Sequence, residues 1–132
     1  MRIMVDANIL VSAIFFESKR LDEVFQIIFR EHTLVISSYT VEELFDTARR
    51  KFPNRISVID DVLARMPYEL VYTPRDIKPG LFEIRDPDDY PVLYTAIIED
   101  VDVLVTGDKD FADVVVEKPE ILTPAKFIEK YS

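Results

Sequence analysis

Short apolar segments of strand length alternate with segments of helical periodicity along the whole chain. This alternation restricts the fold most, because strand, crossover helix and next strand join as right-handed units with parallel strands. A parallel sheet needs helices on both of its faces. We therefore expect a three-layer α/β/α fold around a central parallel sheet of four to five strands.

The expected elements follow from hydrophobic periodicity and from proline and glycine positions. Strands are expected at 2–5, 33–37, 69–72, 101–106 and, as a short fifth, 120–122. Helices are expected at 8–16, 20–30, 40–52, 55–66, 88–100 and 124–130, with 73–85 as a loop. No repeat or linker interrupts the pattern, so the 132 residues are expected to form one domain, 1–132.

Composition excludes several kinds of chemistry. The chain has no cysteine, one histidine (His32) and two glycines. Thiolate metal sites, disulfides, multi-histidine metal sites and glycine-rich phosphate loops are therefore absent. Catalysis would have to use carboxylates, amides, hydroxyls, lysine and arginine.

Charge and hydropathy limit location and partners. Sixteen Lys and Arg oppose twenty-five Asp and Glu, a net charge of −9, which disfavours bulk attraction to nucleic acid. An enzyme whose acidic residues are neutralised by metal ions stays compatible with this charge. The N-terminal segment lacks the features of a signal peptide, and no apolar run spans a membrane, so we expect a cytoplasmic protein without a membrane partner.

Acidic side chains gather where the predicted parallel strands end, the edge at which such sheets bind ligands. Four separate stretches contribute them: Asp6 after the first strand, Glu42 and Glu43 after the second, Asp108 after the fourth, and Asp86, Asp88 and Asp89 around the start of helix 88–100.

Each acid also has a purely structural interpretation. Asp6 can cap the following helix. Thr40-x-x-Glu43 is a capping box, and a helical wheel places Glu43 opposite the apolar face of its own helix. Asp88 can cap helix 88–100, which leaves Asp89 at the head of a buried stripe without a structural partner.

Asp108 and Asp110 in TGDKDF can be turn residues. Taken together, however, the acids favour a metal site. Two carboxylates ~4 Å apart repel by ~4 kcal/mol at an effective dielectric of 20, and Lys109 is the only basic residue close in sequence. Mg²⁺ binds carboxylate oxygens, water and substrate phosphate, and would relieve this repulsion.

The sequence also resembles the PIN-domain family, and within it the VapC-like group of bacteria and archaea. The resemblance rests on VDANILVSAIF, SSYTVEEL, DPDDYPVLYTAI and VLVTGDKDF, in family order from Met1 to about Phe127. It implies a 3-2-1-4-5 parallel sheet and a Mg²⁺- or Mn²⁺-dependent ribonuclease that leaves 5′-phosphate and 3′-hydroxyl ends.

Carried over by position, the resemblance implies a catalytic quartet of Asp6, Glu43, Asp89 and Asp108. We predict that Asp6, Asp89 and Asp108 bind the metal, directly or through water, and that Glu43 completes the cluster. The pattern from Ser37 to Leu44 selects Glu43 over Glu42, against the helical wheel. Accessory residues near the site are Asn8, Thr106, Asp110, Asp86 and Asp88.

The RNA-binding surface and the partners are less defined by the sequence. Arg49, Arg50, Lys51 and Arg55 form the one basic cluster, interpreted either as an RNA contact or as charges that complement a helix C-terminus. The resemblance implies a homodimer, and for toxin members an antitoxin whose basic side chain enters the acidic site.

Three other functions are compatible with parts of the pattern. A phosphoacceptor receiver domain needs an Asp at the end of the third strand, where Tyr72 and Thr73 stand instead. A haloacid-dehalogenase-type phosphatase needs D-x-D after the first strand, where position 8 is Asn. A PIN-like interaction module with little or no nuclease activity stays open beside the ribonuclease.

Overall fold

The computed structural model describes residues 1–132 and contains one five-stranded sheet. Its strands are β1 (Arg2–Val5), β2 (Thr33–Ser37), β3 (Glu69–Val71), β4 (Val103–Val105) and β5 (Glu120–Leu122). All neighbouring strands are parallel, in the order β3-β2-β1-β4-β5. The expected α/β class and sheet order are confirmed.

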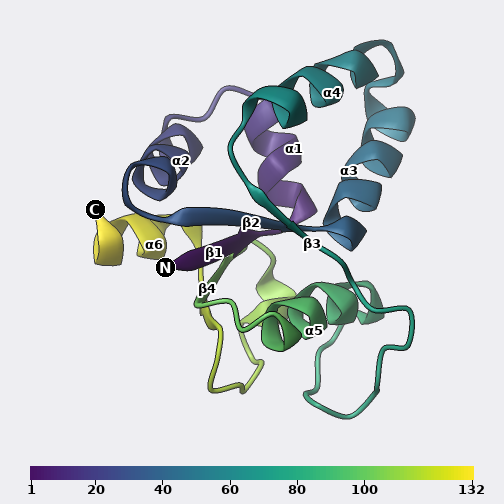
Figure 1. The fold of residues 1–132 in the computed structure, drawn as a ribbon, viewed down its shortest axis with the longest axis vertical. Helices are drawn as coiled ribbons and strands as arrows, with labels where there is room; N and C mark the ends of the chain where they lie inside the picture. The colour runs from purple at the N-terminus through teal and green to yellow at the C-terminus, as the bar shows by residue number, and fades with distance from the viewer.

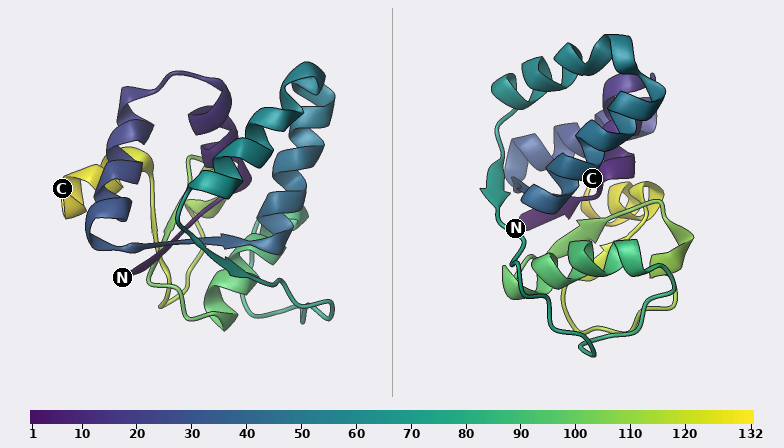
Figure 2. Two further views of the ribbon diagram at one scale, coloured as in Figure 1. Left: turned by 45° about the horizontal axis from the view of Figure 1, so that its top comes forward. Right: turned by 90° about the vertical axis from the view of Figure 1, so that its right-hand side faces the viewer.

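Helices cover both faces of this sheet, as Figures 1 and 2 show. They are α1 (Ala7–Phe15), α2 (Lys19–Glu31), α3 (Ser38–Lys51), α4 (Ile56–Arg65), α5 (Tyr90–Ile98) and α6 (Pro124–Tyr131). Three short 3-10 turns, η1 (Pro53–Arg55), η2 (Pro87–Asp89) and η3 (Lys109–Phe111), complete the chain. Helices α1 to α4 lie on one face and α5 on the other.

The core divides at the sheet because successive side chains of a strand point to opposite faces. Ile3 and Val5 of β1 belong to the cluster beneath α1, α2, α3 and α6. Met4, between them, belongs to the second cluster with Val92 and Leu93 of α5. A strand buried on both sides needs a continuous apolar sequence, as RIMV provides after its first residue.

Two expected elements are shorter in the structure at both ends. The helix expected at 88–100 begins only at Tyr90, after the turn η2, and ends at Ile98. Asp100 adopts a left-handed φ of 55°, which closes the helix. The strand expected at 101–106 is correspondingly shorter, Val103–Val105.

None of the six helices combines the length and the apolar character that a membrane crossing requires.

Candidate functional site

Asp6 occupies the end of β1 and is almost fully buried. Its carboxylate accepts a hydrogen bond from the backbone N–H of Ile9 (3.0 Å), so it caps α1. It also accepts from the hydroxyl of Thr106, which in turn accepts from the N–H of Asp108 at 3.1 Å. Burial raises the pKa of Asp6, and the charge of Asp108 acts in the same direction. The carboxyl ends of β1 and β4 are thus linked by polar contacts.

Glu43 lies in the second turn of α3, not in the first. The expected capping box with Thr40 as the cap is wrong, because Ser37 caps the helix instead. The Ser37 hydroxyl oxygen accepts from the Thr40 N–H at 3.1 Å, and the two hydroxyls lie 3.0 Å apart. Glu43 is therefore free of a capping role.

The half-buried Glu43 faces other acids. Burial, with the charges of Asp6, Asp88 and Asp86, raises its pKa to about 7. The helical wheel was correct that Glu43 lies away from the apolar face of α3, but that side of the helix borders the acidic edge.

The Asp89 side chain caps no helix. The expected cap at Asp88 is wrong: Asp86 accepts from the Asp88 N–H at 2.9 Å, and no capping bond reaches Asp89. The Oδ2 atom of Asp89 is buried without any hydrogen-bond partner, the only such side-chain atom in the chain. Burial, with the charges of Asp108 and Asp86, raises the pKa of Asp89 to about 7.

Three carboxylates lie particularly close together. One oxygen each from Asp86, Asp89 and Asp110 falls within 4.8 Å of the others. Two of these, Asp86 and Asp110, were expected only as accessory residues. This group of three carboxylates differs from the expected metal-binding set of Asp6, Asp89 and Asp108. Asp108 is nevertheless close enough to Asp89 to raise its pKa, and Asp6 raises the pKa of Glu43.

Asp108 and Asp110 also serve the turn after β4. The Asp108 carboxylate accepts from the Asp110 N–H at 2.9 Å and opens η3. Arg85 approaches this turn, 3.9 Å from Asp110 and 3.3 Å from Asp113, but stays mostly exposed. Sequence reasoning missed Arg85 as a nearby cation; its position beside Asp86 was the available signal.

Tyr39 was also missed, and nothing in its local sequence distinguishes it. Its hydroxyl donates to the backbone carbonyl of Asp88 at 3.0 Å and so ties α3 to η2. Burial and the surrounding acids, Glu43 first among them, raise its pKa to about 12. Asn8, in the first turn of α1, is exposed.

The basic cluster lies at the C-terminal end of α3 and in η1. Arg49 pairs with Asp46 at 2.8 Å, and the Arg55 guanidinium lies 5.1 Å from the ring centroid of Phe15. Arg50 forms no ion pair. It lines a small groove of about 260 Å³ together with Glu43 and other residues of α3 and η2.

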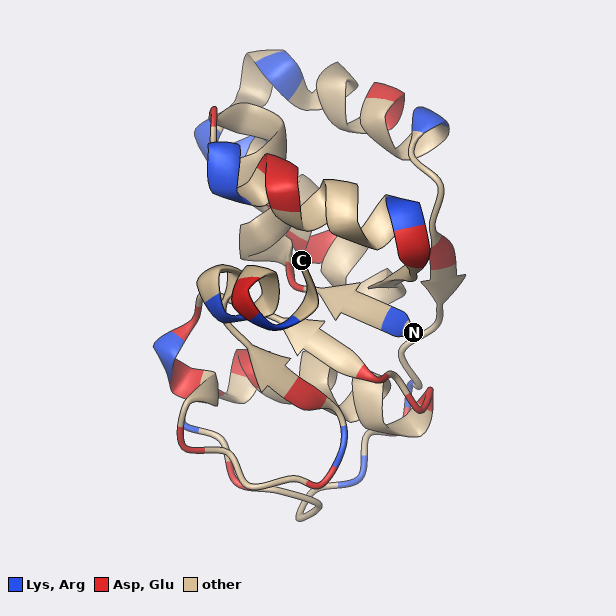
Figure 3. Ribbon diagram, turned by 90° about the vertical axis from the view of Figure 1, so that its left-hand side faces the viewer, with Lys and Arg blue, Asp and Glu red and all other residues tan.

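Lys51 is exposed at the last position of α3. Figure 3 shows Lys and Arg positions interspersed with Asp and Glu positions along the helices and loops. Of the four basic residues, only Arg50 lines a groove together with a residue of the expected quartet, Glu43.

The donor set at this edge suits a hard divalent cation. It offers carboxylate and hydroxyl oxygens only, the ligands preferred by Mg²⁺. A buried carboxylate oxygen without a partner is costly, and a bound cation would remove that cost at Asp89. The residues present therefore fit a divalent metal.

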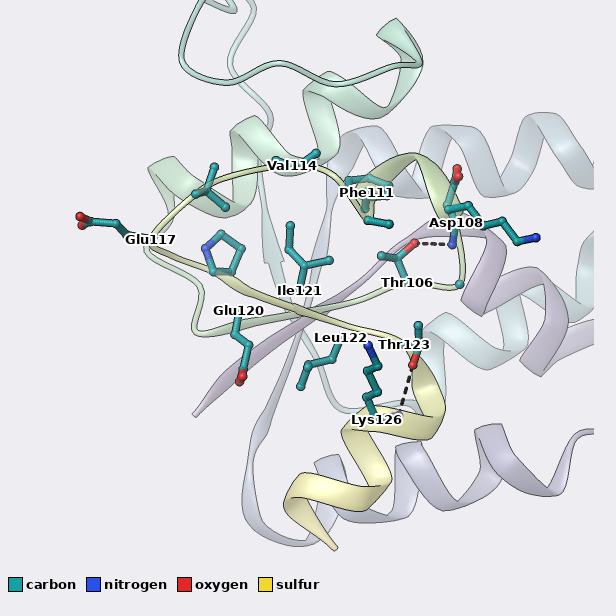
Figure 4. A pocket seen from close by; sticks show the side chains of 15 residues that line it. Thr106, Asp108, Phe111, Val114, Glu117, Glu120, Ile121, Leu122, Thr123 and Lys126 are labelled. Carbon is teal, nitrogen blue, oxygen red and sulfur yellow. Dashed lines mark hydrogen bonds between the residues drawn. The ribbon is translucent and has the colours of Figure 1, made fainter.

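A larger cavity, about 580 Å³, opens beside the same edge (Figure 4). It extends from the residues that follow β4 to β5 and the first turn of α6.

Comparison with known proteins gives one family match. A family model described as PIN domain matches residues 2–110. Among curated proteins, none matches the sequence significantly.

Several solved structures share the fold. VapBC2 from Rickettsia felis, bound to a DNA fragment from its promoter, is 24% identical with a TM-score of 0.71, over 92% of this chain and 97% of that one. DNA-bound VapBC from Salmonella typhimurium is 19% identical with a TM-score of 0.69, over 94% and 98%.

The sarcin–ricin-loop-cleaving toxin VapC20 of Mycobacterium tuberculosis is 11% identical with a TM-score of 0.62, over 83% of this chain and 92% of that one. At these identities, the likeness establishes the fold.

Proposed function

The chain belongs to the PIN-domain family, and on this premise we propose that it is a divalent-metal-dependent ribonuclease that hydrolyses RNA phosphodiester bonds. The single observation that carries the proposal is the buried, unpartnered Oδ2 of Asp89 among other carboxylates. A fold that retains such a costly group has a use for it, and a metal site is the use that its donor atoms fit.

In the proposed site, Asp6, Asp89 and Asp108 hold the metal, directly or through water, and Glu43 completes the cluster. Asp86 and Asp110 support Asp89, because their oxygens lie within 4.8 Å of it. A divalent cation bound there supplies a Lewis acid that offsets phosphodiester charge and makes water more acidic.

The chain's own residues orient the reactants. Thr106 fixes the Asp6 carboxylate by donating to it, while Ile9 fixes it from the helix. Glu43, whose pKa is raised to about 7, can take up a proton at its carboxylate near neutral pH, as a general base requires.

Arg50 is the residue we propose for the RNA backbone on the α3 side. It lies seven positions after Glu43, a rise of about 10 Å along the helix, and shares the groove with it. Arg49, Lys51 and Arg55 would contribute less. Arg49 is already paired with Asp46, and the Arg55 guanidinium lies over Phe15.

We further propose that the protein is the toxin of a toxin–antitoxin pair and forms a homodimer. Support comes from the structural likeness to VapBC complexes. An acidic site of this kind would be inhibited by a partner that inserts a basic side chain, because such a side chain offsets the same repulsion as the metal.

The test is cleavage of a panel of structured and single-stranded RNAs by the wild type and Asp6→Asn, in Mg²⁺, in Mn²⁺ and in EDTA. We expect metal-dependent cutting that the variant loses. A wild type that neither cuts nor binds metal would instead indicate an interaction module.

A further inference from the structure

The cavity of about 580 Å³ begins at the acidic edge and leads away from it. Thr106, Gly107 and Asp108 form its end nearest the proposed site, and β5 with the start of α6 forms the opposite side. Its volume falls within the ~300–1,000 Å³ typical of small-molecule sites. Apart from Thr106 and Asp108, none of its lining residues has a role in the proposed hydrolysis.

One wall of this cavity is apolar. Phe111, Val114 and Ile121 line it, and Figure 4 shows the Ile121 side chain in the space between the η3 loop and β5. Ile121 and Val114 are partly buried and keep some accessible surface, whereas Phe111 is almost fully buried. A planar apolar group, such as a nucleobase, would bury that surface.

The opposite side carries a free cation. Lys126 lines the cavity, and its ammonium group lies within 4.0 Å of no carboxylate, unlike Lys130 four residues later. The two glutamates of the lining do not neutralise it. Glu120 accepts from Lys130 and from Tyr131, and Glu117 points away from the cavity in Figure 4.

An apolar wall and an unpaired ammonium group, next to the edge where the scissile phosphodiester must lie, together match one nucleotide. The neutral base would pack on the wall and the phosphate would contact Lys126. Lys126 is exposed and forms no ion pair, so its ammonium group is available to an anionic ligand that arrives from outside.

On the premise of the proposed nuclease function, we propose that this cavity binds a nucleotide of the RNA substrate adjacent to the scissile bond, with Lys126 as a positioning residue for its phosphate. This cavity would bind the strand on one side of the acidic site and Arg50 would bind it on the other.

Binding is tested without metal or turnover. Adenosine and uridine 5′-monophosphates are titrated into the ¹⁵N-labelled protein, and inorganic phosphate and an acidic tetrapeptide serve as comparison probes. We expect the nucleotides to shift the amides of Gly107, Ile121 and Lys126, with weaker shifts in Lys126→Ala and retention in Lys126→Arg. The control is Lys19→Ala, an exposed lysine of α2 outside the cavity.

The consequence for cleavage is a change in KM with little change in kcat. Lys126→Ala should raise KM about tenfold, the loss expected for one charged hydrogen bond. It should reduce the slope of log binding constant against log salt by about 0.7, the value for one single-strand phosphate contact. Lys19→Ala should change neither.

The outcomes separate the two proposals. Metal-dependent cleavage with an unchanged KM and salt slope in Lys126→Ala would overturn the nucleotide pocket and leave the ribonuclease intact. Nucleotide shifts that depend on Lys126, in a protein that cuts no RNA, would support the pocket and count against the ribonuclease. Shifts produced by the acidic peptide alone would overturn the pocket in favour of a protein partner.

Discussion

Replacing Asp89 by Asn should stabilise the metal-free protein while removing its activity. The rise in the pKa of Asp89 from 3.8 to about 7 corresponds to about 4 kcal/mol at ~1.4 kcal/mol per pKa unit. Because the side chain is partly exposed, solvent screening reduces this to about 2 kcal/mol. Burial is the largest cause of this rise, and the neighbouring carboxylates Asp108, Asp86 and Asp110 raise the pKa further.

The sign with pH follows from proton uptake. A carboxyl whose pKa is raised in the folded state binds more protons folded than unfolded between pH ~4 and ~7, so the wild type loses stability as pH rises through that window. Asp89→Asn has no carboxyl group at this position, so its stability does not fall in this way. Its advantage in unfolding free energy should therefore grow from about 1 kcal/mol at pH 5 to about 2 kcal/mol at pH 8.

The assay is thermal and urea unfolding in EDTA at both pH values. An advantage of about 2 kcal/mol raises Tm by about 6–10 °C for a chain of this size. Saturating Mg²⁺ should stabilise the wild type and close the gap, because only the wild type retains the full ligand set. Asp60→Asn, which removes an exposed acid of α4, is the matched control.

Two results would refute this reasoning. Destabilisation of Asp89→Asn at pH 8 would mean that the carboxylate has a structural partner. An equal gain in Asp60→Asn would mean that net charge, rather than the site, sets the stability.

Three further predictions concern the same edge. Asp6→Asn should lose RNA cleavage while its Tm stays close to that of the wild type, because the amide oxygen can still accept from the helix N–H; Asp6→Ala should lose about 1 kcal/mol in urea unfolding with the cap. A collapse of folding in the Asn variant would show that Asp6 is structural. Glu43→Gln should lower the rate constant of single-turnover cleavage by about 100-fold or more, as expected for the loss of a general base. A change within experimental scatter would show that Glu43 is not the general base. Arg50→Ala should raise KM for RNA about tenfold while Arg49→Ala, already paired with Asp46, should not; equal effects would mean that the basic cluster acts only through bulk charge.

Periodicity predicted the layers and all five strands. The central strands β1, β2 and β4 are largely buried and therefore read as apolar runs, whereas the edge strands β3 and β5 are partly exposed. RIMV and TLVIS are apolar runs of strand length, and the helices expected between them predict the parallel pairing that the structure has. Asp6 and Asp108 each follow a strand in the sequence. Because the carboxyl ends of parallel strands lie at one edge of the sheet, the sequence correctly predicted that both residues lie at that edge.

Capping was where sequence reasoning failed. Ser37 is both the last residue of β2 and the N-cap of α3. Because Ser37 fits the strand pattern, the sequence analysis assigned the cap to Thr40 instead. Asp86 and Asp88 each precede a possible helix start, and only the geometry of Pro87 and the turn decides which side chain reaches the free N–H. The cavity beside Asp108 joins η3, β5 and α6, segments whose separation in the sequence carries no signal of contact.

The most direct test of the metal site is the position of Mn²⁺ in an anomalous difference map from crystals grown with the ion. We predict one or more ions within coordination distance of carboxylate oxygens of Asp89 and of Asp6 or Asp108, with Oδ2 of Asp89 as a ligand. A map in which Mn²⁺ occupies only surface carboxylates elsewhere, while Asp89 stays without a partner, would contradict the account.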